Sequence, residues 1–371
     1  MRAHSVWMCV VLFALPIHAA TTVTVAQLEH FLSSSRAGRM SDEETADRLS
    51  AVSLSEQLTA VSLNRIRMET NLGPKSEEQL DLLAAASIFA APPADEVPKL
   101  AAPSSREQER IVQAARDYTR RALALLPDFV AVRSTRYFTN VPAAVNGKRV
   151  KPRILMHQTR ESRREIVYRD GHEMKRAIGA PGSESGEQSA MAGLSTWGEF
   201  GAILTVALND SSADNLQWSR WQKGDAGIQL AVFRYTVPRV NSHYKVDFCC
   251  FQKSLDEPVD YEFHDKPGYA GEIYIDPTNG EINQITLDAQ LDEGPVSRSA
   301  IAVRYGPVII AGKRYVCPLW SIAISDFDNA LIEKIDGVGT ERHLNETEFT
   351  GYHKFGSTSR ILSDAVGAPR N

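Results

Sequence analysis

Histidines are the residues of this sequence best suited to acid–base chemistry or metal binding, because imidazole exchanges protons near neutral pH. None of those after residue 127 has the spacing of a zinc-binding HExxH helix or a similar pair. They are His157, His172, His243, His264, His343 and His353. His343 and Glu346 are three residues apart, as on one helix face, but the surrounding TERHLNETEF alternates like a strand and places them on opposite faces. The histidine pattern therefore predicts neither a catalytic residue nor a metal ligand set.

Nucleophile motifs are equally absent from the sequence. There is no GxSxG elbow and no SxxK motif followed by KTG. Cys249 and Cys250 are adjacent and cannot form the spaced CxxC grip of a zinc site. Together with Cys317 they are the cysteines that follow the N-terminal apolar run, and an odd number allows one intramolecular bridge at most. We expect a disulfide between Cys317 and either Cys249 or Cys250. We also expect no catalytic residue, no metal and no cofactor, hence a protein that is not an enzyme.

The stretch GEIYIDPTNGEINQITLDA, residues 271–289, predicts a β-hairpin. Ile273 and Ile275 alternate before its centre, and Ile285, Leu287 and Ala289 alternate after it. Asp276, Thr278 and Gly280 resemble part of a calcium loop, which needs further acidic ligands and a terminal Glu. Turn chemistry explains the segment DPTNG better, because Asp caps its own turn and Asn-Gly tolerates positive φ.

The first 20 residues have the pattern of a secretory signal, with Arg2, an apolar run and small residues before a cleavage site. The run is too short to span a bilayer, and no other stretch is long and apolar enough. We therefore expect a periplasmic or extracellular protein without a transmembrane segment. A net charge of −5 is ordinary for a soluble protein and argues against nucleic acid as a partner.

The rest of the chain divides into a helical head, 21–127, and a β-rich body, 128–362, followed by a tail, 363–371, that we expect to be disordered. Three pairs have the spacing of a capping box and indicate helix starts in the head: Ser41 with Glu44, Ser53 with Glu56, and Ser104 with Glu107. The predicted helices are 25–35, 42–50, 54–69, 74–90 and 105–126.

The body alternates with period two, and short connections require its neighbouring strands to be antiparallel. One apolar helix near 197–208 interrupts it and is expected to pack on a sheet face. The predicted fold class is α+β, with a helical region followed by a large curved antiparallel sheet. The predicted strands are 129–139, 153–160, 164–169, 172–178, 216–222, 228–237, 243–251, the two of the hairpin, 300–305, 308–310, 314–319, 320–326 and 341–349.

Charge is unevenly distributed along the body. Residues 129–178 hold 12 Lys and Arg against 4 Asp and Glu, whereas residues 254–295 hold 1 Lys against 11 Asp and Glu. Opposite charges favour each other across neighbouring strands, so we expect the acidic hairpin to face the basic strands. The alternative is that the blocks form separate surfaces, of which the basic one would attract an anionic partner such as lipid head groups or an acidic polymer.

Aromatic residues gather in the body. A curved sheet with bulky residues on its concave side can enclose an apolar ligand, although filling of the core is the commoner reason for such residues. The residues of the expected ligand face are Trp197, Phe233, Tyr235, Tyr244 and Phe248.

The hairpin GEIYIDPTNGEINQITL, preceded by antiparallel strands in a chain with a signal, resembles the G-x-x-x-I-D-P-x-x-G-x-x-x-x-I hairpins of LolA/RseB-type periplasmic proteins. The resemblance covers residues 128–350. It implies a curved antiparallel sheet with helices packed inside and a role as a lipoprotein carrier or envelope sensor. The head and the long second half of the body depart from that pattern, and no functional residue is carried over. The layout, with AVFRYTVPRVNSHYKVDFCC and VRYGPVIIAGKRYVCPLWSIAIS, also resembles uncharacterised secreted bacterial proteins with a helical head.

The function expected first is non-enzymatic binding of a hydrophobic or lipidated ligand or an envelope protein. The alternative is a structural or protein-interaction module with a solid core and no small ligand.

Overall fold

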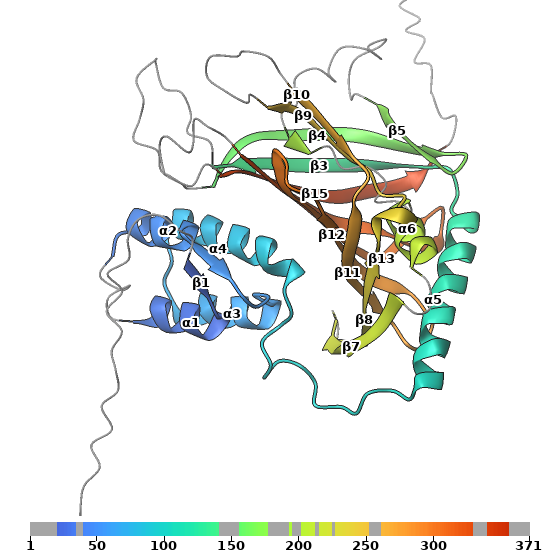
Figure 1. The fold of residues 1–371 in the computed structure, drawn as a ribbon, viewed down its shortest axis with the longest axis horizontal. Coiled ribbons are helices and arrows are strands. Elements are labelled where there is room, and N and C mark those ends of the chain that lie inside the picture. The colour runs from blue at the N-terminus through green and yellow to red at the C-terminus, as the bar shows by residue number, and fades with distance from the viewer. Residues whose placement is uncertain are drawn as a thin grey trace, which may run out of the picture.

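A computed structural model describes residues 21–34, 40–140, 156–176, 193–194, 202–211, 215–224, 227–251, 261–328 and 340–355. It confirms the α+β class: a helical region precedes a ten-stranded antiparallel sheet (Figure 1). The predicted signal at 1–20, the predicted tail at 363–371 and Trp197 lie outside the described residues.

The head is a small helical unit with its own core. Thr24 with Gln27 and Ser41 with Glu44 form complete capping boxes, which satisfy free N–H groups at the starts of the first two helices. Leu28, Leu49, Ile66 and Leu80 meet in the middle and are almost fully buried. The elements are β1 (Thr21–Val23), α1 (Val25–Ser33), α2 (Asp42–Ser50), β2 (Val52–Leu54), α3 (Ala60–Glu69), α4 (Pro74–Ala86) and the 3-10 turn η2 (Ser87–Phe89).

The helix predicted at 54–69 is wrong at its N-terminal end. Ser53 lies in β2, which pairs in parallel with β1, and α3 begins only at Ala60 with Thr59 as its N-cap. Glu56 does accept a backbone N–H, but that of Val25 at the start of α1, at 2.9 Å. Glu56 therefore forms a tertiary contact with the first helix, and the Ser53–Glu56 pair caps no helix of its own.

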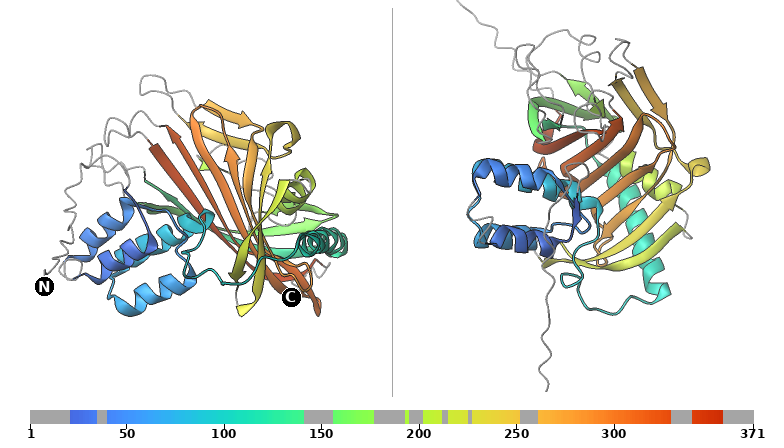
Figure 2. Two further views of the ribbon diagram at one scale, coloured as in Figure 1. Left: turned by 60° about the horizontal axis from the view of Figure 1, so that its bottom comes forward. Right: turned by 60° about the vertical axis from the view of Figure 1, so that its left-hand side comes forward.

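A proline-containing connector leads from the head to the longest helix, α5 (Ser105–Leu125). The Ser104 hydroxyl caps α5 by accepting from the Glu107 N–H at 3.3 Å. The connector is tied to the sheet, because the Trp221 indole donates to the Ala101 carbonyl at 2.8 Å. It thereby passes one edge of the sheet and delivers α5 to the side opposite the head, as Figure 2 shows.

The large sheet has the strand order β5-β4-β3-β15-β14-β13-β12-β11-β8-β7, and every neighbouring pair is antiparallel. A separate sheet has the order β10-β9-β6. One further helix, α6 (Ala202–Asp210), lies within the predicted helical segment at 197–208 and continues to Asp210. The strand bounds are β3 (Phe129–Thr139), β4 (His157–Arg169), β5 (His172–Arg176), β6 (Gly193–Leu194), β7 (Leu216–Lys223), β8 (Gln229–Val237), β9 (Val246–Phe251), β10 (Tyr261–Asp265), β11 (Gly268–Ile275), β12 (Ile282–Gln290), β13 (Val296–Ile310), β14 (Lys313–Asp328) and β15 (Thr340–Lys354).

Three strands are longer than predicted, because prediction divided each of them into two. Residues 157–160 and 164–169 join as β4, 300–305 and 308–310 join as β13, and 314–319 and 320–326 join as β14, while 153–155 lie outside the described residues. In β13 the ladder continues through Gly306 and Pro307, which face Cys317 and Val316. A bulge between Arg304 and Tyr305 absorbs the irregularity. In β13 glycine and proline therefore lie beside a bulge and do not end the strand.

The predicted hairpin is confirmed as β11 and β12. Ile273 faces Ile285 across it, and the Asp276 carboxylate accepts from the Thr278 N–H at 2.8 Å. The Gly280 N–H donates to the Asp276 carbonyl at 2.9 Å with a φ of 80° at Gly280. A Cβ at Gly280 would lie 2.5 Å from the Ala114 carbonyl of α5, so the turn packs directly against that helix. Asp276 therefore stabilises the turn by accepting hydrogen bonds within it, as the sequence predicted.

The two faces of the sheet carry different partners. We call the face that contacts α5 and α6 the inner face, and the face that contacts the head the outer face (Figures 1 and 2). On the outer face, Leu82 and Ile88 of the head join Phe138, Ala302 and Ile322 in one apolar cluster. The Gln79 side-chain amide also donates to the Met156 carbonyl at 2.7 Å. The head is thus attached to the middle of the sheet by a small apolar patch.

Candidate functional site

The inner face is divided into two parts by its side chains. From β13 to β7 it is apolar: Phe233, Ile273, Ile285 and Val303 are each at most 1% exposed and belong to one cluster. Ile111 and Ala115 of α5, and Ile203, Leu204, Ala207 and Leu208 of α6, complete the same cluster. Two helices of the chain therefore cover the apolar part of the inner face.

Tyrosines in this apolar part are satisfied by internal hydrogen bonds. The Tyr235 hydroxyl donates to the Thr286 carbonyl at 2.6 Å, and the Tyr269 hydroxyl donates to the Asp210 carboxylate at 2.8 Å. Burial raises the pKa of both phenols far above the usual value. Asp210 also accepts from the backbone N–H of His243 at 2.7 Å, so it fastens the end of α6 to the sheet. These hydroxyls stabilise the core and leave no donor for a ligand.

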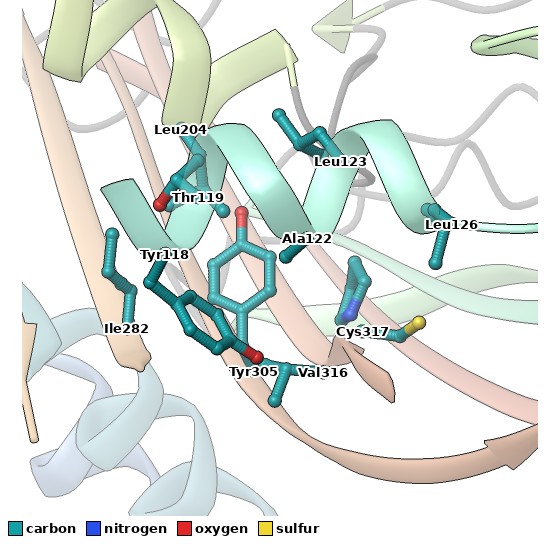
Figure 3. A pocket seen from close by; sticks show the side chains of 11 residues that line it. Tyr118, Thr119, Ala122, Leu123, Leu126, Leu204, Ile282, Tyr305, Val316 and Cys317 are labelled. Carbon is teal, nitrogen blue, oxygen red and sulfur yellow. The ribbon is translucent and has the colours of Figure 1, made fainter. Parts of the chain in front are cut away.

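One small cavity lies between α5 and the sheet (Figure 3). Its volume is about 30 Å³, and its wall includes Tyr118, Leu204, Ile282, Tyr305 and Cys317. Burial raises the pKa of the Tyr118 phenol and of the Cys317 thiol, each to about 12, so both groups are protonated at neutral pH. Such a volume holds about one water molecule and is far below the several hundred Å³ of a typical ligand pocket.

The predicted apolar-ligand face is distributed among three environments. Phe233 and Tyr235 are 1% exposed and form part of the core beneath α6. Tyr244 is half-buried and contacts Tyr269, with ring centroids 5.7 Å apart. Phe248 lies in β9 of the separate sheet, and its side chain, like Trp197, is outside the described residues. Phe233 and Tyr235 line no open surface, because the helices cover them.

Cys317 carries a free, buried thiol, contrary to the disulfide expected with Cys249 or Cys250. It packs with Phe129, Tyr168 and Phe349 near the beginning of β14. Val246, the first residue of β9, packs instead against Phe327 at the end of β14. Ten residues of strand separate Cys317 from Phe327, about 33 Å, whereas bridged Cα atoms are at most about 7 Å apart. The four residues from Val246 to Cys250 span at most about 13 Å of strand. Cys249 and Cys250, which lie near the far end of β14, therefore cannot reach Cys317.

The inner face over β3, β4 and β15 is apolar near Phe129, Ile166 and Phe349 and becomes polar farther along these strands. Thr135 and Thr347 share a hydrogen bond of 2.9 Å across neighbouring strands, and both are buried. The Tyr137 hydroxyl lies 3.3 Å from that of Ser162, and the Arg160 guanidinium lies 4.4 Å from the centre of the Tyr137 ring. This part of the sheet presents hydroxyl and guanidinium groups where the other part presents aliphatic side chains.

Three of the predicted histidines each contact one carboxylate. His243 pairs with Asp210 at 2.7 Å, His264 with Asp247 at 2.8 Å, and His343 with Glu341 at 2.6 Å. They lie in different parts of the molecule. Ser325 is opposite His343 on β14, but its buried hydroxyl has no hydrogen-bond partner among the described residues, so this serine is not joined to the His343–Glu341 pair as a nucleophile. Within the described residues, no three His, Cys, Asp or Glu side chains gather as metal ligands.

The expected facing of the acidic hairpin and the basic strands is wrong. Strands β15, β14 and β13 separate β3 from β12. The acidic residues of the hairpin region are instead paired with arginines of nearby elements: Glu272 with Arg220, Glu281 with Arg314, and Asp265 with Arg239, at 2.5 to 2.6 Å. We call β7, β8, β11 and β12 the acidic end of the sheet, and β3, β4 and β5 the basic end.

Charges at the basic end are less completely matched. Arg136 pairs with Glu346 at 2.5 Å, and Arg133 lies 3.9 Å from Glu173. Arg160 and Arg163 are exposed, and the described part of the chain supplies no carboxylate to either. The basic composition of this segment is evident in the sequence, but these two residues do not stand out there, because the predicted strands 153–160 and 164–169 divide β4 between them. The run HQTRESRRE, with one acid among three arginines before its last residue, was the available signal.

Comparison of the chain with known protein families, with curated proteins and with solved structures finds no match. The fold and the site thus define a class only: an α+β protein with an antiparallel sheet whose inner face is partly filled by its own helices. Among the described helices, none combines the length and the apolar character needed to cross a bilayer.

Proposed function

We propose that this protein is an exported, non-enzymatic protein-interaction module of the cell envelope, built around a solid core. The observation that carries the proposal is the filling of the apolar inner face by α5 and α6. A carrier must bury most of an apolar ligand in a cleft, and here the equivalent surface is occupied by Ile111, Leu204 and Leu208. A role in contacts between proteins requires only an exposed surface, which the head and the two sheet edges provide.

The export part of the proposal rests on the signal-like pattern of the first 20 residues. Fractionation of cells that express the full chain, compared with a chain lacking those residues, tests it. We expect the full chain outside the cytoplasm and the shortened chain within it. Equal cytoplasmic retention of both chains would contradict export.

The solid core is tested by native mass spectrometry of protein purified from its own host, combined with uptake of a fluorescent fatty acid. We expect no co-purified lipid and no uptake. Leu204→Ala is the positive control, because it enlarges the cavity beneath α5 and should admit a small apolar probe such as benzene. Stoichiometric lipid on the unaltered protein would overturn the proposal.

A second candidate is the binding of a small apolar ligand, and the cavity lined by Tyr118, Leu204 and Ile282 is the observation in its favour. Its small volume means that α5 would have to move away from the sheet to admit a lipid chain. The turn at Gly280 and the contact from Arg110 to the Pro277 carbonyl at 3.0 Å hold α5 in place. The interaction module is therefore the better supported of the two.

A further inference from the structure

Strand β7 is the last strand at the acidic end of the large sheet, and its second edge carries no further strand. The sheet order ends at β7, which pairs with β8 alone. Every residue of β7 is described, and no backbone group of the described chain hydrogen-bonds the edge that faces away from β8. The connector passes this edge, but it is joined there through the Trp221 indole, a side chain of the inner face. Unpaired strand edges readily accept another extended segment.

The sequence of β7 reads nearly the same in both directions. Its central part is QWSRWQ, residues 217–222. Two copies of this segment can pair antiparallel about a two-fold axis that passes through its centre. Trp218 of one copy then lies opposite Trp221 of the other, and Gln217 lies opposite Gln222. The segment is therefore complementary to itself in an antiparallel pair.

A bulge in β7 makes the two halves match in face as well as in residue type. Opposite residues of an antiparallel pair share one face, whereas residues three apart on a regular strand lie on opposite faces. The register of β7 on β8 shifts between Trp218 and Arg220. As a result Trp218 and Trp221 both lie on the inner face, beside the apolar cluster. Gln217 and Gln222 both lie on the outer face, because they pair with β8 residues that alternate with those of the cluster.

The side chains at these positions suit contact with a second copy. Trp218 and Trp221 are half-buried and pack edge-on, with ring centroids 4.9 Å apart, so a second copy can extend this aromatic group. Gln217 is exposed. The Gln222 Oε1 accepts from Arg220 at 2.9 Å, which leaves the side-chain N–H groups of Gln222 to donate to Gln217 of a second copy.

Charge does not oppose the pairing. Arg220 is the only charged residue within 217–222, and Glu272 neutralises it at a distance of 2.6 Å. The two-fold axis places Lys223, at the end of the strand, opposite the uncharged Leu216 of the second copy. The edge can therefore meet its own copy without bringing unmatched like charges together.

We propose that β7 pairs antiparallel with β7 of a second copy of this chain, so that the two sheets continue into each other across a two-fold axis. The inner faces of both copies then lie on the same side. Because the contact is limited to one short strand from each chain, we expect a reversible dimer. The inference goes beyond the proposed function and depends neither on export nor on the solid core.

Cysteine crosslinking tests the register of the pair. A Gln217→Cys chain mixed with a Gln222→Cys chain should form a disulfide-linked dimer on oxidation, because the two positions are opposite each other between copies. Within one chain they are five residues apart, about 16 Å, which is too far for a bridge. Either chain alone should give only the background of the unaltered protein, which retains Cys249 and Cys250.

Sedimentation velocity over a range of concentrations tests the affinity. The unaltered protein should show a dimer that increases with concentration. Gln217→Lys/Gln222→Lys should weaken it about tenfold or more, because the two-fold axis then places lysine opposite lysine twice. Gln113→Lys/Gln158→Lys is the matched control: it changes two exposed glutamines of α5 and β4 in the same way and should leave the dimer intact. Circular dichroism of both variants verifies that they fold.

Several results would overturn the proposal. A protein that stays monomeric at every concentration would mean that the bulge and Lys223 guard the edge against strand pairing. A dimer that the β7 variant does not weaken, or that the control variant weakens equally, would belong to another surface. Crosslinking of either chain alone as strongly as of the mixture would exclude this register. None of these results bears on the solid core, which lipid co-purification tests separately.

Discussion

The two ends of the ten-stranded sheet have the same antiparallel backbone pattern, but their side chains differ in how they pack and how their charges are paired. At the acidic end, apolar side chains of the inner face meet α5 and α6, and the carboxylates are paired with arginines of the same chain. At the basic end, an apolar cluster around Phe129 and Ile166 gives way to hydroxyl groups, and Arg160 and Arg163 have no carboxylate from the described residues. The comparison indicates that the described carboxylates and arginines are paired more completely at the acidic end than at the basic end.

The comparison predicts that truncation of a core residue at the acidic end is the most damaging change. Phe233 is 1% exposed and packs edge-on against Trp218, with ring centroids 5.6 Å apart. Phe233→Ala should lower the free energy of unfolding by about 3–5 kcal/mol, through lost burial and the cavity it leaves. Urea unfolding followed by circular dichroism measures it. A loss below about 1 kcal/mol would mean that this end of the core is loosely packed.

The buried ion pair on the outer face of the acidic end comes next. Arg220 donates to Glu272 at 2.6 and 2.8 Å and to the Tyr274 hydroxyl at 3.1 Å. Arg220→Met should cost about 3 kcal/mol, because it leaves the Glu272 carboxylate with the exposed Arg234 as its only positively charged partner among the described residues, beside the Tyr274 hydroxyl. The double variant Arg220→Met/Glu272→Gln should recover part of the loss. Equal instability of the single and double variants would contradict a charge-pairing role.

The same pair predicts how stability depends on pH. Burial by itself raises the pKa of Glu272, but hydrogen bonds and charge from Arg220 outweigh burial and hold that pKa below the usual value of 4.5. The unfolded chain then binds more protons than the folded one below that value, so this contribution is present above pH 4.5 and is lost as the pH falls further. Urea unfolding at several pH values should show a smaller acid-induced loss in Glu272→Gln than in the unaltered protein. Identical pH profiles would remove Glu272 as a source of the dependence.

Where β15 meets the basic end, part of the inner face should depend on a buried hydroxyl pair, Thr135 with Thr347. Thr347→Val keeps the shape of the side chain but leaves the buried Thr135 hydroxyl without this partner, which should cost about 1–2 kcal/mol. In the double variant Thr135→Val/Thr347→Val no hydroxyl is left, so the stability should return toward that of the unaltered protein. Chemical denaturation of both variants makes the test, and a double variant less stable than the single one would refute the hydroxyl pairing.

The smallest effect is expected at an exposed arginine of the basic end. Arg163 is exposed and has no carboxylate among the described residues, so Arg163→Gln should change the free energy of unfolding by less than about 0.5 kcal/mol. Thermal and urea unfolding would measure this change. A substantial loss would show that Arg163 stabilises the fold in spite of its exposure.

Local patterns in the sequence determined much of the architecture. The alternation of Ile273 and Ile275 with Ile285 and Leu287 was enough to place the hairpin, because a buried face fixes the register of a strand pair. Side-chain caps at Thr24 and Ser41 mark two helix starts for an equally local reason. The same local signals failed at Ser53 and Glu56, where the carboxylate contacts a residue 31 positions away.

Only the tertiary structure decided which side chains meet. Composition does not determine the order of strands in a sheet. The sequence alone suggested that the acidic and basic segments would neutralise each other. In the structure three strands separate them, and each is paired with other residues. Likewise Cys317 is a suitable partner for Cys249 or Cys250 by count, yet the length of β14 separates them. Periodicity reports how one segment is buried, whereas pairing between distant segments depends on the free energy of the whole sheet. The sequence could therefore predict an antiparallel body with a helical head, and the structure alone could show that the acidic and basic strands lie at opposite ends of the sheet.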